Sequence, residues 1–234
     1  TVARAIDAGV RGLVLNSPHN PTGAVLRREA LEAIAKLCVE HDLWLISDEV
    51  YAAMVYDGSH VSPAILPGMA ERTVVLGSLS KSHAMPGWRV GWAAAQPELI
   101  APMLSLASCM FFGQPPFVQD GAVAAIEQCA EEAARIRDLY RARRDLVCDG
   151  LAGVAGLRAH RPEGGMFVML DIRETGLSAQ DFAWRLLDTE AVALLPGDGF
   201  GEAARGHLRF SLSAPLDRLE EAVKRIARFA GTLG

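Results

Sequence analysis

The sequence predicts an α/β protein whose first part is built on a mostly parallel sheet. The strand-like apolar runs there are GLVL (12–15), LWLI (43–46), TVVL (73–76) and VGWAAA (90–95). Between the first two runs, apolar side chains recur at the spacing of one helix face, at Leu31, Ile34, Ala35 and Cys38. Strands that alternate with helices in this way form βαβ units, in which the strands run parallel.

After Pro97 the sequence pattern changes from strand-like runs to helical periodicity. Helical patterns cover 99–109 and then 117–150, and the second stretch is long enough for two helices. Short strand-like runs at 166–170, 191–195 and 207–212 then alternate with helical patterns at 178–187 and 216–229. The pattern therefore predicts a second, smaller α/β domain that begins near residue 150.

Composition argues against nucleic-acid and membrane partners. The net charge of the 234 residues is −5, so there is no basic surplus, and no apolar run approaches the roughly 18 residues that span a bilayer. The four cysteines form no C-x-x-C pair, which favours a reduced, cytoplasmic protein. The six histidines lack metal-ligand spacing, so no metal is expected. The opening TVARAIDAG is typical of the end of a helix rather than of a signal peptide, and we expect it to continue an upstream segment.

Polar side chains follow the first three predicted strands. In open parallel sheets, ligands bind beyond the carboxyl ends of the strands. The three runs lead into NSPHNPTG (16–23), SDEVY (47–51) and GSLSK (77–81). The side chains delivered to this edge are Asn20, Asp48, Tyr51, Ser78 and Lys81, and Arg89 follows. Each has an ordinary alternative as a turn, cap or solvated loop residue, but their convergence on one edge favours a functional site.

These motifs resemble those of the pyridoxal 5'-phosphate (PLP) aminotransferases of fold type I, class I/II. The resemblance rests on NPTG, SDEVY, S-x-S-K and G-W-R-V-G, and continues through PEGGMF, PGDGFG and HLRFSLS. It implies PLP as cofactor, an amino acid and a 2-oxo acid as partners, and a homodimer. It also implies that residues 1–149 form the C-terminal portion of the large PLP-binding domain with an interdomain helix, and residues 150–234 the small C-terminal domain.

The resemblance assigns a role to each candidate residue. Lys81 is the amine that holds PLP as a Schiff base and then shuttles a proton. Asp48 keeps the pyridine nitrogen of the cofactor protonated. Tyr51 and Asn20 donate to the phenolate oxygen of the ring, and the family suggests a cis peptide at Asn20–Pro21 that turns Asn20 inward.

The remaining candidates bind anionic groups. The resemblance implies that Ser78 and Arg89 hold the cofactor phosphate, since a guanidinium fork suits phosphate oxygens, and that Ser80 is a weaker candidate. Arg209 is implied to clamp the α-carboxylate of the substrate, and Asn20 is a further candidate for binding the substrate.

Within the family, runs such as NSPHNP, HDLW, LSKSHAM and GMFVM are similar to the arginine–pyruvate transaminases of bacterial arginine catabolism. The resemblance implies transfer of the amino group of L-arginine to pyruvate. Two alternatives stay open, a PLP-dependent C–S β-lyase and an aminotransferase-like sensing domain of a transcription regulator. Family members usually carry a phosphate loop and a ring-stacking aromatic residue well before NPTG, so we expect the 234-residue chain alone to be inactive, largely cofactor-free and prone to associate.

Overall fold

The computed structural model describes residue 6 and residues 9–233, and the chain forms two compact units there. Unit 1 contains the residues up to Pro18 together with Val25–Arg137, and unit 2 contains His19–Ala24 and the residues from Asp138 onward. The division falls within helix α6 (Ala130–Gly150). A domain boundary near residue 150 stays a prediction, and most of the helix end expected at residues 1–9 lies outside the described residues.

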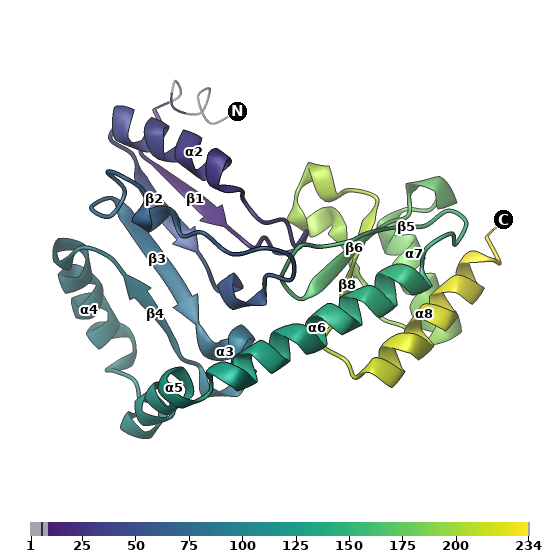
Figure 1. The fold of residues 1–234 in the computed structure, drawn as a ribbon. Coiled ribbons are helices and arrows are strands. Elements are labelled where there is room, and N and C mark those ends of the chain that lie inside the picture. Colours follow the sequence, from purple (N-terminus) through teal and green to yellow (C-terminus); the bar gives the residue numbers. More distant parts are fainter. Residues whose placement is uncertain (1–5, 7–8, 234) are drawn as a thin grey trace. The chain divides into compact units, whose positions relative to one another are not determined.

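A four-stranded sheet organises unit 1, and Figure 1 shows its strands side by side. The strands are β1 (Gly12–Asn16), β2 (Trp44–Asp48), β3 (Thr73–Ser78) and β4 (Gly91–Ala94), in that order. The first three run parallel and β4 runs antiparallel to β3, which confirms the mostly parallel sheet. Asn16 is level with Asp48, and Asp48 with Leu76, so the carboxyl ends of β1, β2 and β3 meet at one edge.

Helix α2 (Arg28–Glu40) supplies the apolar core beside β1 and β2. Its predicted face is confirmed, because Leu31, Ala35 and Cys38 are buried. They belong to one cluster with Leu43, Leu45, Leu66 and Met69. This packing fixes β2, whose last residue is Asp48.

The other helices of unit 1 follow β3 and β4. They are α3 (Leu79–Ser82), α4 (Pro97–Phe111), α5 (Pro116–Gln128) and the first part of α6. The helices expected over 99–109 and 117–150 are thus confirmed, the second as two helices. Short 3-10 turns lie at Ala52–Met54, Pro63–Ile65 and Pro86–Trp88. No helix in the described part of the chain combines the length and the apolar character that a membrane crossing requires.

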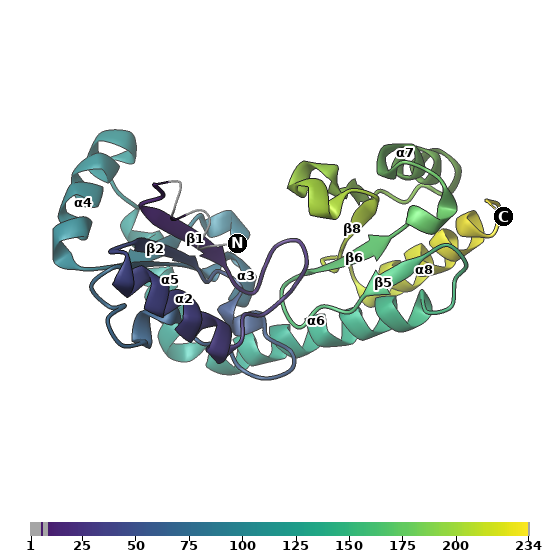
Figure 2. The same cartoon turned by 90° about the horizontal axis from the view of Figure 1, so that it is seen from above.

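Unit 2 holds a second, antiparallel sheet, with its strands in the order β5-β6-β8-β7, and Figure 2 labels β5, β6 and β8. The strands are β5 (Arg158–His160), β6 (Phe167–Asp171), β7 (Leu195–Pro196) and β8 (His207–Ser211). Helices α7 (Ala179–Glu190) and α8 (Leu216–Ala230) pack together, with the Phe182 and Phe229 rings edge to face at 4.9 Å. Further 3-10 turns lie at Arg173–Thr175, Gly197–Phe200 and Glu202–Ala204.

One predicted strand is wrong in its extent. We expected a strand over 191–195, but the strand there covers only Leu195–Pro196. Ala191 adopts a left-handed conformation, with φ of 55°, as the C-cap of α7, and its amide donates to the carbonyl of Leu187. The backbone therefore turns at the position where the apolar run begins, and extended pairing starts only four residues later.

Candidate active site

Asp48 ends β2 and begins the loop that carries Tyr51. Its carboxylate accepts a hydrogen bond from the amide of Val50 (3.3 Å), which fixes the side chain over the turn. Its backbone carbonyl accepts from the Asn16 side chain and from the Ser17 amide, both at 3.2 Å. The end of β2 is therefore tied to the end of β1, and Tyr51, 4% exposed, is buried just beyond it.

Ser78 and Lys81 lie at the end of the neighbouring strand, β3. The Ser78 hydroxyl accepts from the amide of Ser80 (3.1 Å) and so caps α3, while it donates to the carbonyl of Val90 (3.1 Å). Lys81 lies in the last turn of α3, with its ammonium 6.0 Å from the centroid of the Tyr51 ring. The structure thus brings the predicted lysine and phenol together.

Arg89 follows a 3-10 turn and has a left-handed backbone, with φ of 53°. Its guanidinium donates to the carbonyl of Pro86 (2.9 Å), and its own carbonyl accepts from the Gln114 side chain (2.9 Å). The side chain is exposed, so its contact with Pro86 can be exchanged for a contact with a ligand.

A buried network next to Asp48 was not found from the sequence. The carboxylate of Glu49 accepts from Ser47 (2.9 Å) and Ser62 (2.6 Å), and it lies 2.8 Å from Nε2 of His60. Burial acts to raise the pKa of Glu49, but the hydrogen bonds from His60, Ser62 and Ser47 outweigh it, so the pKa lies below its usual value. The SDEVY motif contains Glu49 and its partner Ser47, but the other two partners, His60 and Ser62, are 11 and 13 residues away and nothing in the motif points to them.

Asn20 and Arg209 meet within unit 2. An N–H of the Arg209 guanidinium donates to the side-chain oxygen of Asn20 (3.0 Å). The same guanidinium lies over the Phe167 ring at 4.1 Å and the Phe200 ring at 4.9 Å from their centroids. Two cation–π contacts and one hydrogen bond therefore hold it in place. The motifs PEGGMF and PGDGFG contain the two rings, although nothing in these motifs indicates that the rings contact Arg209.

The predicted site residues fall into two groups. Asp48, Tyr51, Ser78, Ser80, Lys81 and Arg89 belong to unit 1, and Asn20 and Arg209 to unit 2. Both peptide bonds Ser17–Pro18 and Asn20–Pro21 are cis, and the second agrees with the expectation for Asn20. The role of each residue stays a prediction.

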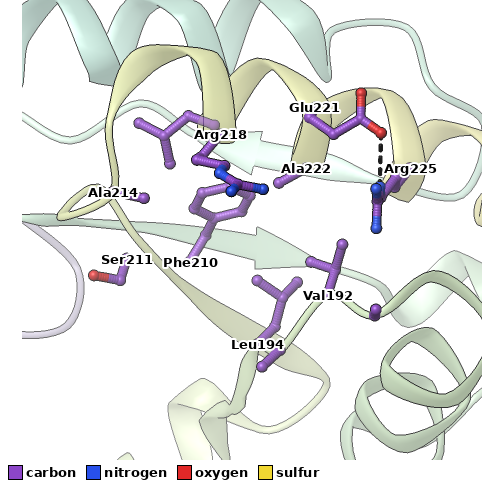
Figure 3. Close-up of a pocket in the computed structure, with 12 residues that line it drawn as sticks. Val192, Leu194, Phe210, Ser211, Ala214, Arg218, Glu221, Ala222 and Arg225 are labelled. Carbon is purple, nitrogen blue, oxygen red and sulfur yellow. Dashed lines mark hydrogen bonds and ion pairs between the residues drawn. The ribbon is translucent and has the colours of Figure 1, made fainter.

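A separate cavity of about 340 Å³ lies in unit 2 and contains none of these residues (Figure 3). Val192, Leu194 and Phe210 give it an apolar floor beside α8. Arg225 at its rim is paired with Glu221 at 2.7 Å. We therefore assign the cavity no part in the candidate active site.

Comparison with known proteins covers nearly the whole chain. The chain is 55% identical over 232 residues to the arginine–pyruvate transaminase AruH of Pseudomonas aeruginosa, and the match covers 99% of this chain. It is 40% identical over 236 residues to the aspartate/prephenate aminotransferase of Thermus thermophilus, with 98% of this chain covered. The chain spans about 59% of the length of each of these relatives.

Solved structures give the same result. The fold superimposes on the aromatic aminotransferase of Pyrococcus horikoshii with a TM-score of 0.92 at 38% identity, covering 98% of this chain and 63% of that one. For the aspartate aminotransferase of Thermus thermophilus with maleate, the TM-score is 0.88 at 40% identity, covering 97% and 59%. The family model for aminotransferases of class I and II matches residues 1–226. The chain therefore belongs to the class I and II aminotransferase family.

Proposed function

We propose that the protein is a PLP-dependent aminotransferase that moves the amino group of L-arginine to pyruvate. Class I and II aminotransferases depend on PLP. The residues of unit 1 suit that group, since an amine, a carboxylate, a phenol, a hydroxyl and a guanidinium follow the ends of β2 and β3. An aldehyde that carries a phosphate needs an amine and anion donors of this kind.

Lys81 would bind the cofactor through its amine and afterwards move a proton at the substrate Cα. Bound PLP supplies an electron sink that makes this Cα proton acidic. Asp48, fixed by the Val50 amide, would hold a proton at the pyridine nitrogen. Tyr51, whose ring lies 6.0 Å from the Lys81 ammonium, would orient the ring of the cofactor by a hydrogen bond. Positioned proton transfer by a residue such as Lys81 contributes roughly 10²- to 10⁴-fold in rate.

Ser78 and Arg89 would bind the cofactor phosphate. Each now makes a hydrogen bond to a backbone carbonyl, of Val90 and of Pro86 respectively, and a phosphate oxygen is a stronger acceptor for both donors. Ser80, the residue directly before Lys81 in α3, is the weaker candidate for the same role.

Arg209 would bind the α-carboxylate of the substrate. Phe167 and Phe200 contact its guanidinium, and Asn20 accepts one of its hydrogen bonds, so the side chain is already ordered before the substrate arrives. A fixed guanidinium favours two-point binding of a carboxylate, because little side-chain entropy is lost on binding. Asn20 would thus position Arg209 as well as contact the cofactor.

The choice of arginine and pyruvate rests on one observation, the 55% identity to a protein named arginine–pyruvate transaminase over 99% of this chain. The test is a panel of amino acid donors offered to the full-length protein with pyruvate, with detection of both the new 2-oxo acid and alanine. Arginine should rank first. A ranking in which aspartate or the aromatic amino acids exceed arginine contradicts the proposed donor, whereas pyruvate and ammonia formed from a sulfur amino acid, without exchange, indicate a β-lyase.

The proposal includes a cytoplasmic homodimer. Four cysteines without a disulfide among the described residues fit a reducing compartment, and exposed apolar side chains on α4 and α5 fit a subunit interface. Light scattering on the full-length protein measures the assembly directly, and a monomer at working concentration contradicts this part of the proposal.

A further inference from the structure

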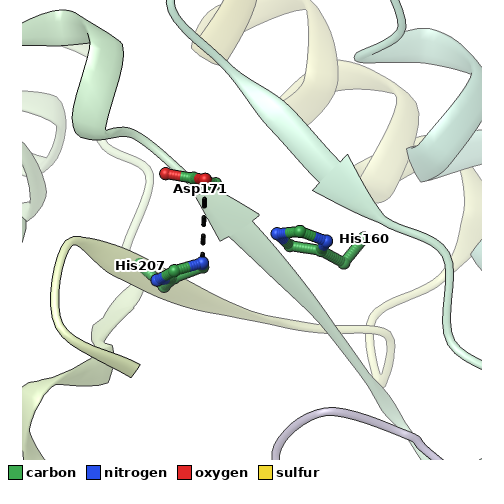
Figure 4. A group of neighbouring side chains, drawn as sticks. All are labelled: His160, Asp171 and His207. Atoms are coloured by element: carbon green, nitrogen blue, oxygen red, sulfur yellow. Dashed lines mark ion pairs between the residues drawn. The ribbon is translucent and has the colours of Figure 1, made fainter. Parts of the chain in front are cut away.

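Three strands of unit 2 bring two histidines and an aspartate together on one face of the sheet. His207 in β8 is directly opposite Asp171 in β6. His160 in β5 is opposite Met169, two residues before Asp171, so its side chain lies on the same face. Figure 4 shows the two imidazoles and the carboxylate turned toward one another.

The distances within this cluster suit a metal ion. One potential ligand atom from each of the three residues lies within 4.8 Å of the others, and Nε2 of His207 is 3.8 Å from the Asp171 carboxylate. Ligands about 2.0–2.2 Å from a tetrahedral zinc ion are roughly 3.4 Å apart, so ligand atoms up to 4.8 Å apart need to approach one another by about 1.4 Å at most. The His160 and His207 ring centroids are 5.4 Å apart, which leaves room for an ion between their edges.

The hydrogen bonds around His160 and His207 leave one ring nitrogen of each available to bind a metal ion. Nδ1 of His207 lies 3.0 Å from the carbonyl of Arg205 and donates to it, so Nε2 keeps a lone pair on the side of Asp171. Metal-bound histidines commonly have such a carbonyl partner. Nε2 of His160 is buried and has no hydrogen-bond partner among the described residues, an arrangement that is unfavourable unless a ligand binds it.

Arg173 forms an ion pair with Asp171, the third potential ligand. Its side chain donates to both oxygens of Asp171, at 2.9 and 2.5 Å. An ion pair with a guanidinium favours the carboxylate form of Asp171, which is the form that binds metal ions. A carboxylate offers about four lone-pair positions, and the Arg173 side chain is 65% exposed, so it can move aside while the metal binds.

We propose that His160, Asp171 and His207 bind one divalent transition-metal ion, with Zn²⁺ as the favoured ion, at a site that includes none of the proposed cofactor residues. Imidazole nitrogens with one carboxylate oxygen match the ligand preference of zinc, and three protein ligands leave a fourth position for water. The ion would join β5, β6 and β8. The spacing of the histidines gave no sign of this site, because each ligand comes from a different strand and only the register aligns them.

The first test is a Zn²⁺ titration by calorimetry of the full-length protein, prepared without a histidine tag. We expect one Zn²⁺ per chain, and a Kd raised at least about 10-fold in each of His160→Ala, Asp171→Asn and His207→Ala. His41→Ala, which removes an exposed histidine beyond α2, is the matched control and should bind as the unaltered chain does. Absence of binding, or equal binding by the His160→Ala and His41→Ala variants, overturns the proposal.

A second measurement uses Co²⁺ with the unaltered chain and does not depend on whether the variants fold. We expect visible absorption bands of a tetrahedral or five-coordinate ion that Zn²⁺ abolishes on addition. A thiolate-to-cobalt charge-transfer band would assign the bound metal to a cysteine such as the exposed Cys109 and overturn the proposal.

Discussion

At the scale of single residues, Lys81 offers the most direct test of the candidate active site. In the full-length protein, Lys81→Ala should remove the covalent PLP adduct that borohydride fixes, because this lysine follows the end of β3 beside Tyr51. Mass spectrometry of the reduced protein measures the adduct. Lys36→Ala is the matched control, since Lys36 is an exposed lysine of α2. Persistence of the adduct in a folded Lys81→Ala variant would disprove the role of this residue.

The lowered pKa of Glu49 predicts how the free energy of unfolding depends on pH. Its pKa is lowered in the folded chain, so its contribution is present above the pKa of the unfolded chain, about 4.3, and disappears as the pH falls through the lower folded value. Glu49→Gln should reduce the free energy of unfolding by about 1–3 kcal/mol at pH 7, because hydrogen bonds to a buried charge are weakened. Urea unfolding at pH 7 and in the acidic range measures both effects.

The free energy of unfolding at acidic pH distinguishes the specific effect of Glu49 from a general effect of removing a charge. The unfolding free energy of Glu49→Gln should fall less between pH 5 and 3 than that of the unaltered chain, and Glu71→Gln, at an exposed position, should follow the unaltered chain. Parallel curves for Glu49→Gln and the unaltered chain would contradict the assigned hydrogen-bond network.

At the scale of secondary-structure elements, the features that depend on a local sequence pattern could be predicted. The buried face of α2 and the apolar runs of β1 to β3 could be predicted, because burial places apolar residues in a pattern that is visible in the sequence itself. β5 was missed because its three residues, Arg158–His160, carry no apolar run and become a strand only by pairing with β6. The cage of Phe167 and Phe200 around Arg209, and the cluster at Asp171, depend on register and turn geometry that no single run of sequence contains.

Close pairing of β3 with β4 makes Gly77 a sensitive position. Gly77 is directly opposite Trp92, and a Cβ at Gly77 would lie 2.3 Å from the indole ring. Gly77→Ala should therefore displace Trp92 and destabilise the chain by about 1–3 kcal/mol, as overpacking does elsewhere. Thermal unfolding measures the loss, and near-ultraviolet circular dichroism follows the tryptophan. Gly87→Ala, where a Cβ meets no atom within 4 Å, is the control, and equal melting temperatures for the two variants would refute the steric argument.

At the scale of the whole molecule, the candidate site combines predictable and unpredictable parts. The edge formed by β1, β2 and β3 could be predicted, because parallel strands end together and each run was recognisable. The assignment of Asn20 to unit 2 could not, because it depends on contacts such as the hydrogen bonds from the Glu163 and Gly164 amides to the Gly23 carbonyl. A turn of six residues therefore belongs by its contacts to a unit that is distant in sequence.

Exposed apolar side chains of unit 1 lead to a prediction about association. Phe112 is 95% exposed, Met110 75% and Phe117 70%, all at or between the ends of α4 and α5. Large apolar side chains that are this exposed favour contacts between molecules. The 234-residue chain should therefore form dimers or larger species at micromolar concentration, as measured by size-exclusion chromatography with light scattering. Replacing both Phe112→Asn and Phe117→Ser should shift the population toward monomer, since asparagine tolerates the left-handed backbone at position 112. Trp184→Ser, at an exposed position of unit 2, should leave the association unchanged, and a monomeric unaltered chain would contradict the prediction.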